Sequence, residues 1–158
     1  MLTGIILAGG KSSRMGEDKA FLRGGVTRLA EELRKSGCDR IIVMCGSSER
    51  KELFSEECVI DQGETLAESL MIVLSKLQGE IQIAPCDAIH ADAEFFSSLN
   101  GVPLDQTGNR QPLLARFLLP LPENTSNKIS DIFKQIPSCE GGIKASNANY
   151  PRDLRELN

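Results

Sequence analysis

Short runs of consecutive apolar, often β-branched residues alternate with segments of helical periodicity along almost the whole sequence. The clearest runs are GIILA (4–8), RIIVMCG (40–46), CVID (58–61) and EIQIAPCD (80–87). Unbroken apolar runs are typical of strands covered on both faces, and strands alternating with helices imply right-handed crossovers and parallel pairing. The sequence therefore predicts an α/β fold: one domain over residues 1–158 with a mostly parallel sheet.

The segments between these runs predict the covering helices. Residues 26–36 carry Val26, Leu29, Ala30 and Leu33 on one helical face, and Gly37 supplies the stop. A second helix is expected over residues 64–78, a third after Asp92 as its N-cap, and a fourth after Ser126 as its N-cap. Further strands are expected within 112–120 and near 142–145.

Composition excludes several classes of protein. The formal net charge of −4 argues against a nucleic-acid-binding protein, and no apolar run approaches the length of a transmembrane helix. The N-terminal residues have neither the basic region nor the cleavage site of a signal peptide. The five cysteines are odd in number and never spaced C-x-x-C, so we expect free, buried thiols in a reducing cytoplasm, with no zinc site.

The residues that directly follow the predicted strands are the candidate ligand-binding groups. In a parallel α/β sheet, ligands bind beyond the carboxyl ends of the strands. Gly9 and Gly10 follow the first run, and Gly46, Asp61 and Asp87 end or follow the next three. We therefore expect these residues to meet at one edge of the sheet.

The glycine pair is followed at once by the basic residues Lys11, Arg14 and Lys19. Glycines let the backbone approach a ligand closely, and exposed N–H groups with nearby cations form an anion site. A polyphosphate cradle is the functional interpretation, and a tight turn with solvated bases is the structural alternative. A P-loop does not fit, because Gly4 precedes Gly10 by one residue too many and the intervening residues read as strand.

LAGGKSSRMGEDKA (7–20) resembles L-A-G-G-x-x-x-R-M-G-x-D-K, the signature of molybdenum cofactor guanylyltransferases and related nucleotidyltransferases. Further similar segments are VID (59–61), PCDAIHADAEF (85–95), RQPLLARF (110–117) and SNANYPRDL (146–154). The resemblance thus extends from end to end of the chain. It implies a single-domain, Rossmann-like three-layer sandwich with a mostly parallel sheet, similar to that of nucleotide-diphospho-sugar transferases.

The resemblance also implies a reaction, in which the terminal phosphate of molybdopterin cofactor attacks the α-phosphorus of GTP and pyrophosphate leaves. Mg²⁺ is the implied cofactor, GTP and molybdopterin cofactor are the implied ligands, and other molybdenum cofactor assembly proteins are possible partners. Neither a membrane nor a nucleic acid is expected as a partner.

The roles implied for single residues follow from the same resemblance. Arg14, Lys19 and Asp87 are the implied catalytic residues. The implied nucleotide-binding residues are Leu7, Ala8, Gly9, Gly10, Lys19, Asp61 and Asp87, and the implied metal-binding residues are Asp87 and Asn149. Leu7, Ala8 and Gly9 would line the base and sugar, whereas Arg14 and Lys19 would neutralise the triphosphate and the leaving pyrophosphate.

The sequence departs from the family pattern at four places. Met44 stands where guanylyltransferases often have a polar residue that helps read the base, and Ile89 replaces a proline of the metal segment. GETLAESL (63–70) stands in place of the family's Gly-Pro-Leu-Ala-Gly stretch, and the segment between Leu99 and RQPLLARF is very short. Two alternatives therefore stay open. One is a related transferase that uses GTP or CTP on another phosphorylated acceptor, such as cobinamide phosphate or a sugar phosphate. The other is a non-catalytic nucleotide-binding partner of cofactor-assembly proteins.

Overall fold

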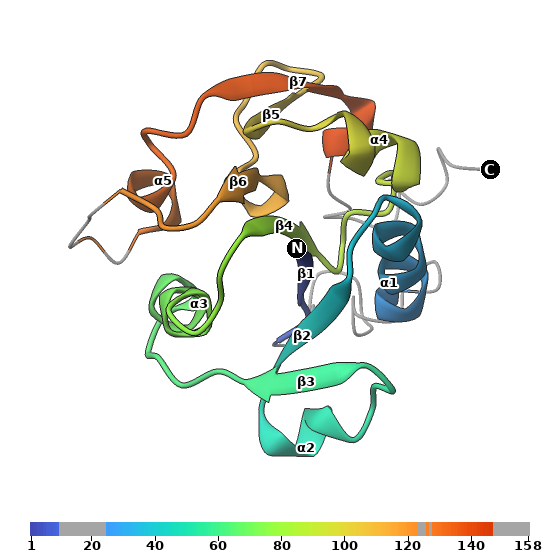
Figure 1. Cartoon of the computed structure of the whole chain (residues 1–158), viewed down its shortest axis with the longest axis vertical. Helices are drawn as coiled ribbons and strands as arrows, with labels where there is room; N and C mark the ends of the chain where they lie inside the picture. The colour runs from blue at the N-terminus through green and yellow to red at the C-terminus, as the bar shows by residue number, and fades with distance from the viewer. Residues whose placement is uncertain (10–24, 123–125, 127, 147–158) are drawn as a thin grey trace.

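The computed structural model describes residues 1–9, 25–122, 126 and 128–146. Its centre is a five-stranded sheet in the order β3-β2-β1-β4-β6 (Figure 1). The strands are β1 (Leu2–Leu7), β2 (Arg40–Gly46), β3 (Glu57–Ile60), β4 (Glu80–Pro85) and β6 (Arg116–Leu118). The first four are parallel and β6 pairs antiparallel with β4, which confirms the predicted mostly parallel sheet.

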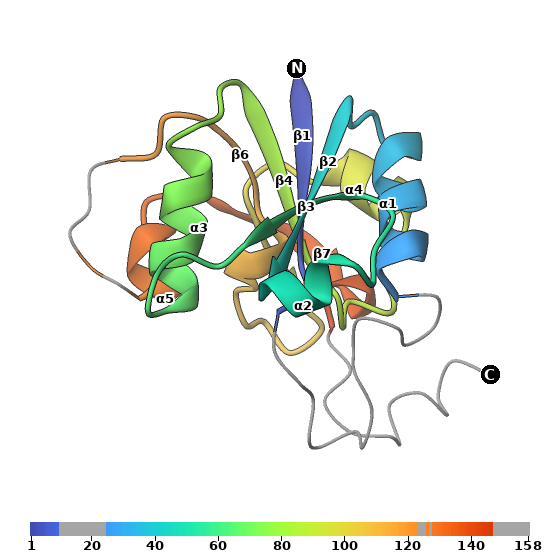
Figure 2. The same ribbon diagram turned by 90° about the horizontal axis from the view of Figure 1, so that it is seen from below.

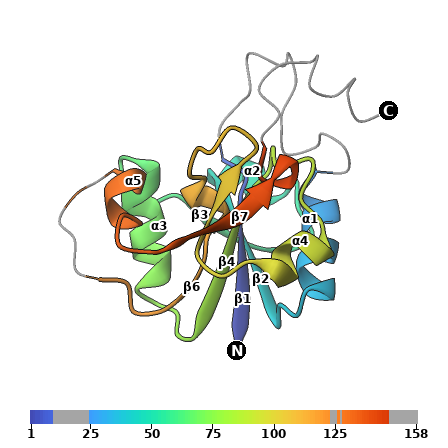
Figure 3. The same ribbon diagram turned by 90° about the horizontal axis from the view of Figure 1, so that it is seen from above.

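Helices cover both faces of this sheet. Viewed in Figure 2, α1 (Gly25–Lys35) and α3 (Leu66–Leu74) flank the strands on opposite sides. Helix α4 (Ala93–Ser98) lies on the same face of the sheet as α1, and α5 (Ile129–Ile132) lies on the same face as α3. The single turn α2 (Ser48–Lys51) lies beside β3. A small parallel sheet of β5 (Val102–Asp105) and β7 (Ser138–Gly142) lies at the β6 end of the molecule (Figures 1 and 3).

Two separate hydrophobic cores explain why consecutive positions in strand runs such as residues 4–8 are apolar. Successive strand residues point to opposite faces, so Ile6 packs into the core beneath α1 while Ile5 and Leu7 pack into the core beneath α3. All three side chains are buried. The three-layer α/β/α sandwich expected from the sequence is confirmed. The strands are apolar on both faces because helices cover both faces of the sheet.

The helix predictions are largely confirmed. Helix α1 buries Val26, Leu29, Ala30 and Leu33, as expected. The Asp92 carboxylate accepts a 2.9 Å hydrogen bond from the Phe95 N–H and caps α4.

Two expectations at the C-terminal end were wrong. Lys128, not Ser126, is the N-cap of α5, and the Ser126 hydroxyl accepts the Lys128 N–H and donates to the Asp131 carboxylate. Residues Ile143–Ala145 form a 3₁₀ turn, after β7 has ended. The strand expected within 112–120 is confirmed as β6, but it is short, because a 3₁₀ turn occupies Pro112–Leu114.

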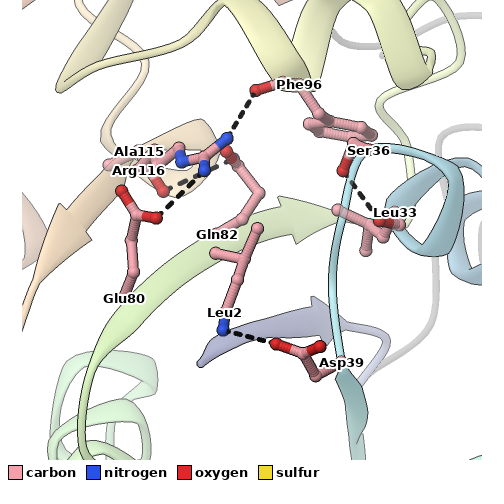
Figure 4. A network of polar contacts seen from close by, with 9 residues as sticks. All are labelled: Leu2, Leu33, Ser36, Asp39, Glu80, Gln82, Phe96, Ala115 and Arg116. Atoms are coloured by element: carbon pink, nitrogen blue, oxygen red, sulfur yellow. Dashed lines mark hydrogen bonds and ion pairs between the residues drawn. The ribbon is translucent and has the colours of Figure 1, made fainter.

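A network of polar contacts ties the amino ends of the strands together (Figure 4). The Asp39 carboxylate accepts a 3.0 Å hydrogen bond from the Leu2 N–H. On the other side of β4, the Arg116 guanidinium donates to Glu80 at 3.0 Å and to the Phe96 carbonyl at 3.3 Å. The polar groups at the amino edge thus hydrogen-bond to one another. The opposite, carboxyl edge of the sheet is therefore the candidate location of a ligand site.

The strand order sets where that site lies. From β1 the chain moves outward in one direction to β2 and β3, and then crosses back to place β4 on the other side of β1. The crevice beyond the carboxyl ends of β1 and β4 is therefore the topological switch point, where ligands bind in open α/β sheets. Within the part of the chain that the structure describes, no helix is long and apolar enough to cross a membrane.

Candidate nucleotide site at the carboxyl edge of the sheet

Two of the predicted site residues follow the paired ends of β1 and β4. Leu7 pairs with Pro85 in the parallel ladder, and the Cys86 N–H continues it with a 2.9 Å hydrogen bond to the Leu7 carbonyl. Gly9 and Asp87 each lie two residues beyond that pair. Both therefore follow the carboxyl ends of neighbouring strands, although they are 78 positions apart in the sequence.

Gly9 also touches the ends of β2 and β3. A Cβ atom on Gly9 would lie 3.2 Å from the Gly46 Cα and 3.3 Å from Asp61 Oδ2, tighter than most contacts of real Cβ atoms. Gly46 and Asp61 are in turn joined by a 3.0 Å hydrogen bond from the Asp61 N–H to the Gly46 carbonyl. Glycine is needed at position 9 because three strand ends converge there.

The Asp61 carboxyl group is incompletely satisfied. Its Oδ1 atom is buried and has no hydrogen-bond partner among the described residues. Burial raises the pKa of Asp61, and a hydrogen bond from the Gly46 backbone opposes that rise. A buried acceptor without a partner is unfavourable unless a ligand supplies the missing donor. The geometry thus suits an N–H or O–H group of a bound ligand.

A cavity of about 330 Å³ opens beside Asp61 on the α3 face of the sheet. Leu7 and Met44 contribute apolar side chains from β1 and β2, and Met44 is only 1% exposed. The remaining lining residues come from the strand ends and from the start of α3: Gly9, Asp61, Gly63, Glu64, Thr65, Leu66 and Ser69. An apolar floor with a few polar groups on the wall is the usual composition of a small-molecule site.

The wall formed by residues 63–65 is held by local hydrogen bonds. The Thr65 hydroxyl caps α3 by accepting the Glu68 N–H at 3.1 Å, and the Ser69 hydroxyl accepts the Gly63 N–H at 3.0 Å. A Cβ on Gly63 would lie 2.5 Å from the Glu68 Cβ, so only glycine fits. Sequence reasoning missed this wall, although Thr65 and Glu68 have the T-x-x-E spacing of a capping box.

Arg50 is a second residue that sequence reasoning missed. From α2 it donates through Nε to the Cys45 carbonyl at 2.9 Å and through Nη2 to the Ala8 carbonyl at 2.6 Å. It therefore ties the end of β2 to the end of β1, directly before Gly9. No periodicity or motif in the sequence indicates such a contact, because it joins residues 42 positions apart.

We expect Arg50→Ala to lower the free energy of unfolding by about 2–3 kcal/mol, because it removes charged hydrogen bonds to two strand-end carbonyls. Lys51→Ala is the matched control, since Lys51 is the next residue and is exposed. Urea unfolding of both variants measures the difference. Equal midpoints for Arg50→Ala and Lys51→Ala would contradict the role given to Arg50.

The predicted site residues do not all face this cavity. Leu7, Gly9 and Asp61 line it, whereas the Ala8 side chain is buried in the core beneath α1 and presents only its carbonyl, to Arg50. Asp87 is half-buried in the turn after β4 and is not among the lining residues. Gly10, Arg14, Lys19 and Asn149 lie outside the described residues.

The oxygen atoms at this edge that could bind a metal suit a site completed by the substrate. Among the described residues, no three His, Cys, Asp or Glu side chains cluster closely enough to hold a metal by themselves. What the edge offers is carboxylates, with one buried oxygen of Asp61 lacking a partner. Such a set suits Mg²⁺, which binds one or two carboxylates and takes its other ligands from substrate phosphates and water.

A larger hollow lies elsewhere on the described surface. About 570 Å³ in volume, it is formed near Gly79 by the end of α3 and by residues 119–121. Gly79 precedes β4, so this hollow is at the amino end of the sheet. No charged side chain lines it, whereas the carboxylates of Asp61 and Glu64 line the smaller cavity. Because ligands bind at the carboxyl ends of parallel strands, the smaller cavity is the candidate site.

The chemistry of the cysteines gives no reason to assign them a role in this site. All five thiols are free, and Cys38, Cys45 and Cys58 are buried. Burial raises the pKa of Cys38 and of Cys58 to about 11. Thiols with such pKa values stay protonated near neutral pH, so these two act as small apolar side chains.

The fold is a doubly wound α/β sandwich, and a cavity of about 330 Å³ lies at the carboxyl edge of its sheet, beside the ends of β1, β2 and β3. The profile of the family described as MobA-like NTP transferase domain matches residues 4–107. The chain therefore belongs to the MobA-like NTP transferase family.

Relatives agree with this assignment. A Bacillus cereus protein described as a probable molybdenum cofactor guanylyltransferase is 31% identical over 137 residues. The match covers 72% of this chain and 66% of that protein, so the chain spans just under two thirds of the length of this relative.

Solved structures show the same fold at low sequence identity. Molybdopterin-guanine dinucleotide biosynthesis protein A from Archaeoglobus fulgidus superposes with a TM-score of 0.67 at 16% identity, covering 98% of this chain and 95% of that one. A 4-diphosphocytidyl-2C-methyl-D-erythritol synthase gives a TM-score of 0.68 at 13% identity, covering 99% and 95%. Proteins named for guanine and for cytidine nucleotides thus share the architecture, so the fold alone does not select the base.

The raised pKa of Asp61 predicts a pH-dependent difference between wild type and Asp61→Asn. The folded-state pKa lies above the unfolded value, so wild-type stability falls as pH rises through that range. Asparagine does not titrate, so we expect the stability of Asp61→Asn relative to wild type to rise as the pH increases above the ordinary aspartate pKa of about 4. Thermal unfolding of both proteins from this pH upward measures the gap. A gap that widens on acidification would contradict the assignment.

Proposed function

We propose that this protein is a nucleotidyltransferase that moves GMP from GTP onto the terminal phosphate of molybdopterin cofactor and releases pyrophosphate. The observation that carries the proposal is the contact of Gly9 with Asp61 beside a cavity of about 330 Å³ at the carboxyl edge of the sheet, with Asp87 following the neighbouring end of β4. The basic residues of 10–24 follow Gly9 directly in the sequence. A site for a purine nucleotide triphosphate needs these parts: a flat apolar floor, polar groups at one rim and cations for the phosphates.

The described residues suit the binding part of this reaction. Leu7 and Met44 offer an apolar surface on which a base can lie, and Asp61 Oδ1 can accept a hydrogen bond from the base or from the ribose. Gly9 leaves room for the nucleotide to approach the backbone between β1 and β2. Met44 has no hydrogen-bonding group, so base selection would rest on the wall of residues 63–65 and on Asp61.

The chemical step would be an in-line displacement. An oxygen of the acceptor phosphate forms a bond to the α-phosphorus of GTP, the bond from that phosphorus to the bridging oxygen breaks, and pyrophosphate carries away the electron pair. Such transfers need alignment and neutralisation of charge more than covalent help from the protein. Arg14 and Lys19 would supply positive charge to the phosphates. Mg²⁺, held by Asp87 with Asn149 as a further candidate ligand, would neutralise phosphate charge when bound.

The test is a thermal-shift comparison of GTP, CTP, ATP and UTP, each with Mg²⁺. We expect GTP to stabilise the protein most, because a ligand at about 100 times its Kd adds roughly 2.7 kcal/mol to the folded state. Equal or larger stabilisation by CTP would favour the alternative of a cytidylyltransferase acting on another phosphorylated acceptor. Binding without release of pyrophosphate in the presence of molybdopterin cofactor would favour a non-catalytic binding partner.

A further inference from the structure

The backbone hydrogen bonds within the turn that carries Asp87 each span only two or three residues. Within it, the Ala88 N–H bonds the Pro85 carbonyl at 3.1 Å and the Ile89 N–H bonds the Asp87 carbonyl at 2.9 Å. The Ala91 N–H reaches the Ala88 carbonyl only at 3.3 Å. Such single-turn hydrogen bonds leave the outward carbonyls of this segment in need of other partners.

Arg28 supplies those partners from α1. Its Nη1 atom donates to the Ala91 carbonyl at 2.7 Å and its Nη2 atom donates to the Ala88 carbonyl at 2.9 Å. Both distances are short for N–H···O bonds, as expected for a charged donor. The planar guanidinium thus spans two carbonyls that are three residues apart, directly after Asp87.

A second residue of α1 holds the far end of the same segment. One helical turn beyond Arg28, Glu32 Oε1 accepts the Ala93 N–H at 3.1 Å, at the start of α4. Half-buried Arg28 lies near the carboxylates of Glu32 and Asp92, which oppose the lowering of its pKa by burial. Residues 88–93 are therefore clamped to α1 at both ends.

We propose that Arg28 is a positioning residue that sets the place of Asp87 relative to the nucleotide site. The inference rests on the proposed function, since it gives Asp87 a role toward Mg²⁺ and phosphate. Arg28 does not touch the substrate in this proposal and acts through the backbone that carries Asp87.

Arginine is required for this role by its shape. Its fork donates two hydrogen bonds in fixed directions, whereas a lysine ammonium is a point charge on a flexible stem. Arg28→Lys keeps the charge and most of the apolar stem but cannot bridge both carbonyls in the same way. Arg34→Lys is the matched control, because Arg34 lies on the same helix and is exposed.

The first measurement is amide hydrogen exchange without nucleotide or metal. In Arg28→Lys we expect exchange in peptides covering 86–93 to become several-fold faster, with peptides from β1 and β2 unchanged and Arg34→Lys matching wild type. Unchanged exchange at 86–93 would overturn the inference whatever the activity of the protein. If Arg28→Lys does not fold, Arg28→Gln, which keeps one amide donor, takes its place in the same comparison.

The second measurement is the magnesium dependence of pyrophosphate release. Residues that orient a metal ligand typically change metal affinity or activity by about 10–100-fold when replaced. We expect Arg28→Lys to need roughly tenfold more Mg²⁺ for half-maximal release, with the KM for the nucleotide at saturating Mg²⁺ little changed. A wild-type magnesium dependence in Arg28→Lys would overturn the positioning role. Wild-type protein that releases no pyrophosphate would instead refute the proposed function, and hydrogen exchange would still decide whether Arg28 holds the turn.

Discussion

Asp87→Asn is expected to lower the rate of magnesium-dependent pyrophosphate release by about 10²–10³, as the loss of one preorganised charge-stabilising group typically does. Asp87 follows the end of β4 that pairs with the end of β1, so in the proposed site its charge would lie near the bound triphosphate. Asparagine keeps the size of the side chain and its ability to accept a hydrogen bond, but it removes the negative charge that Mg²⁺ prefers. The measurement is pyrophosphate release as a function of magnesium concentration.

A purely structural role of Asp87 predicts the opposite outcome. If the carboxyl group only stabilises the turn after β4, then Asp87→Asn should be folded and fully active. Glu94→Gln is the matched control, because Glu94 is a nearby acidic residue of the same segment and is exposed. A magnesium dependence and rate equal to those of wild type would remove Asp87 from the proposed site.

Lys19→Ala is the second substitution with a large expected effect. A lysine in the segment that follows Gly9 and Gly10 would place a full positive charge near the phosphates, where charge develops on the leaving pyrophosphate. We expect turnover to fall by about 10²–10³. We also expect weaker binding of GTP, measured by titration calorimetry beside steady-state kinetics.

Lys11→Ala separates this role from a general effect of positive charge. Lys11 lies in the same segment and carries the same charge, but only Lys19 falls on the lysine of the family signature. If Lys11→Ala and Lys19→Ala lose activity equally, the segment acts through its summed charge. If Lys19→Ala keeps near-normal turnover, the residue has no part in the transfer.

The sequence determined the layers of the fold because the pattern of burial is local. Runs such as residues 4–8 are apolar at every position, and only a strand covered on both faces has that requirement. The buried face of α1 and the Asp92 N-cap of α4 also depend on residues close together in the sequence, and both were predicted correctly. The C-terminal region was predicted less well. There β6 has three residues and α5 a single turn, too short for periodicity to define.

The sequence also determined which residue types stand at the strand ends. Gly9, Asp61 and Asp87 were singled out because ligands bind beyond the carboxyl ends of parallel strands. Their convergence was expected from topology alone, and the structure brings Gly9 against Asp61. The roles of Gly10, Arg14, Lys19 and Asn149 stay predictions, since these residues lie outside the described part of the chain.

Only the tertiary structure decided how these strand ends are held and which side chains face the cavity. Arg50 reaches the Ala8 carbonyl across 42 positions and Arg28 reaches the Ala91 carbonyl across 63. Contacts of this kind go to backbone carbonyls, which every residue carries, so no side-chain pattern marks the acceptor. The strand register likewise turns Leu7 toward the cavity and Ala8 away from it. Local periodicity determines which faces are buried, whereas the meeting of distant backbone segments depends on the complete packing of the chain.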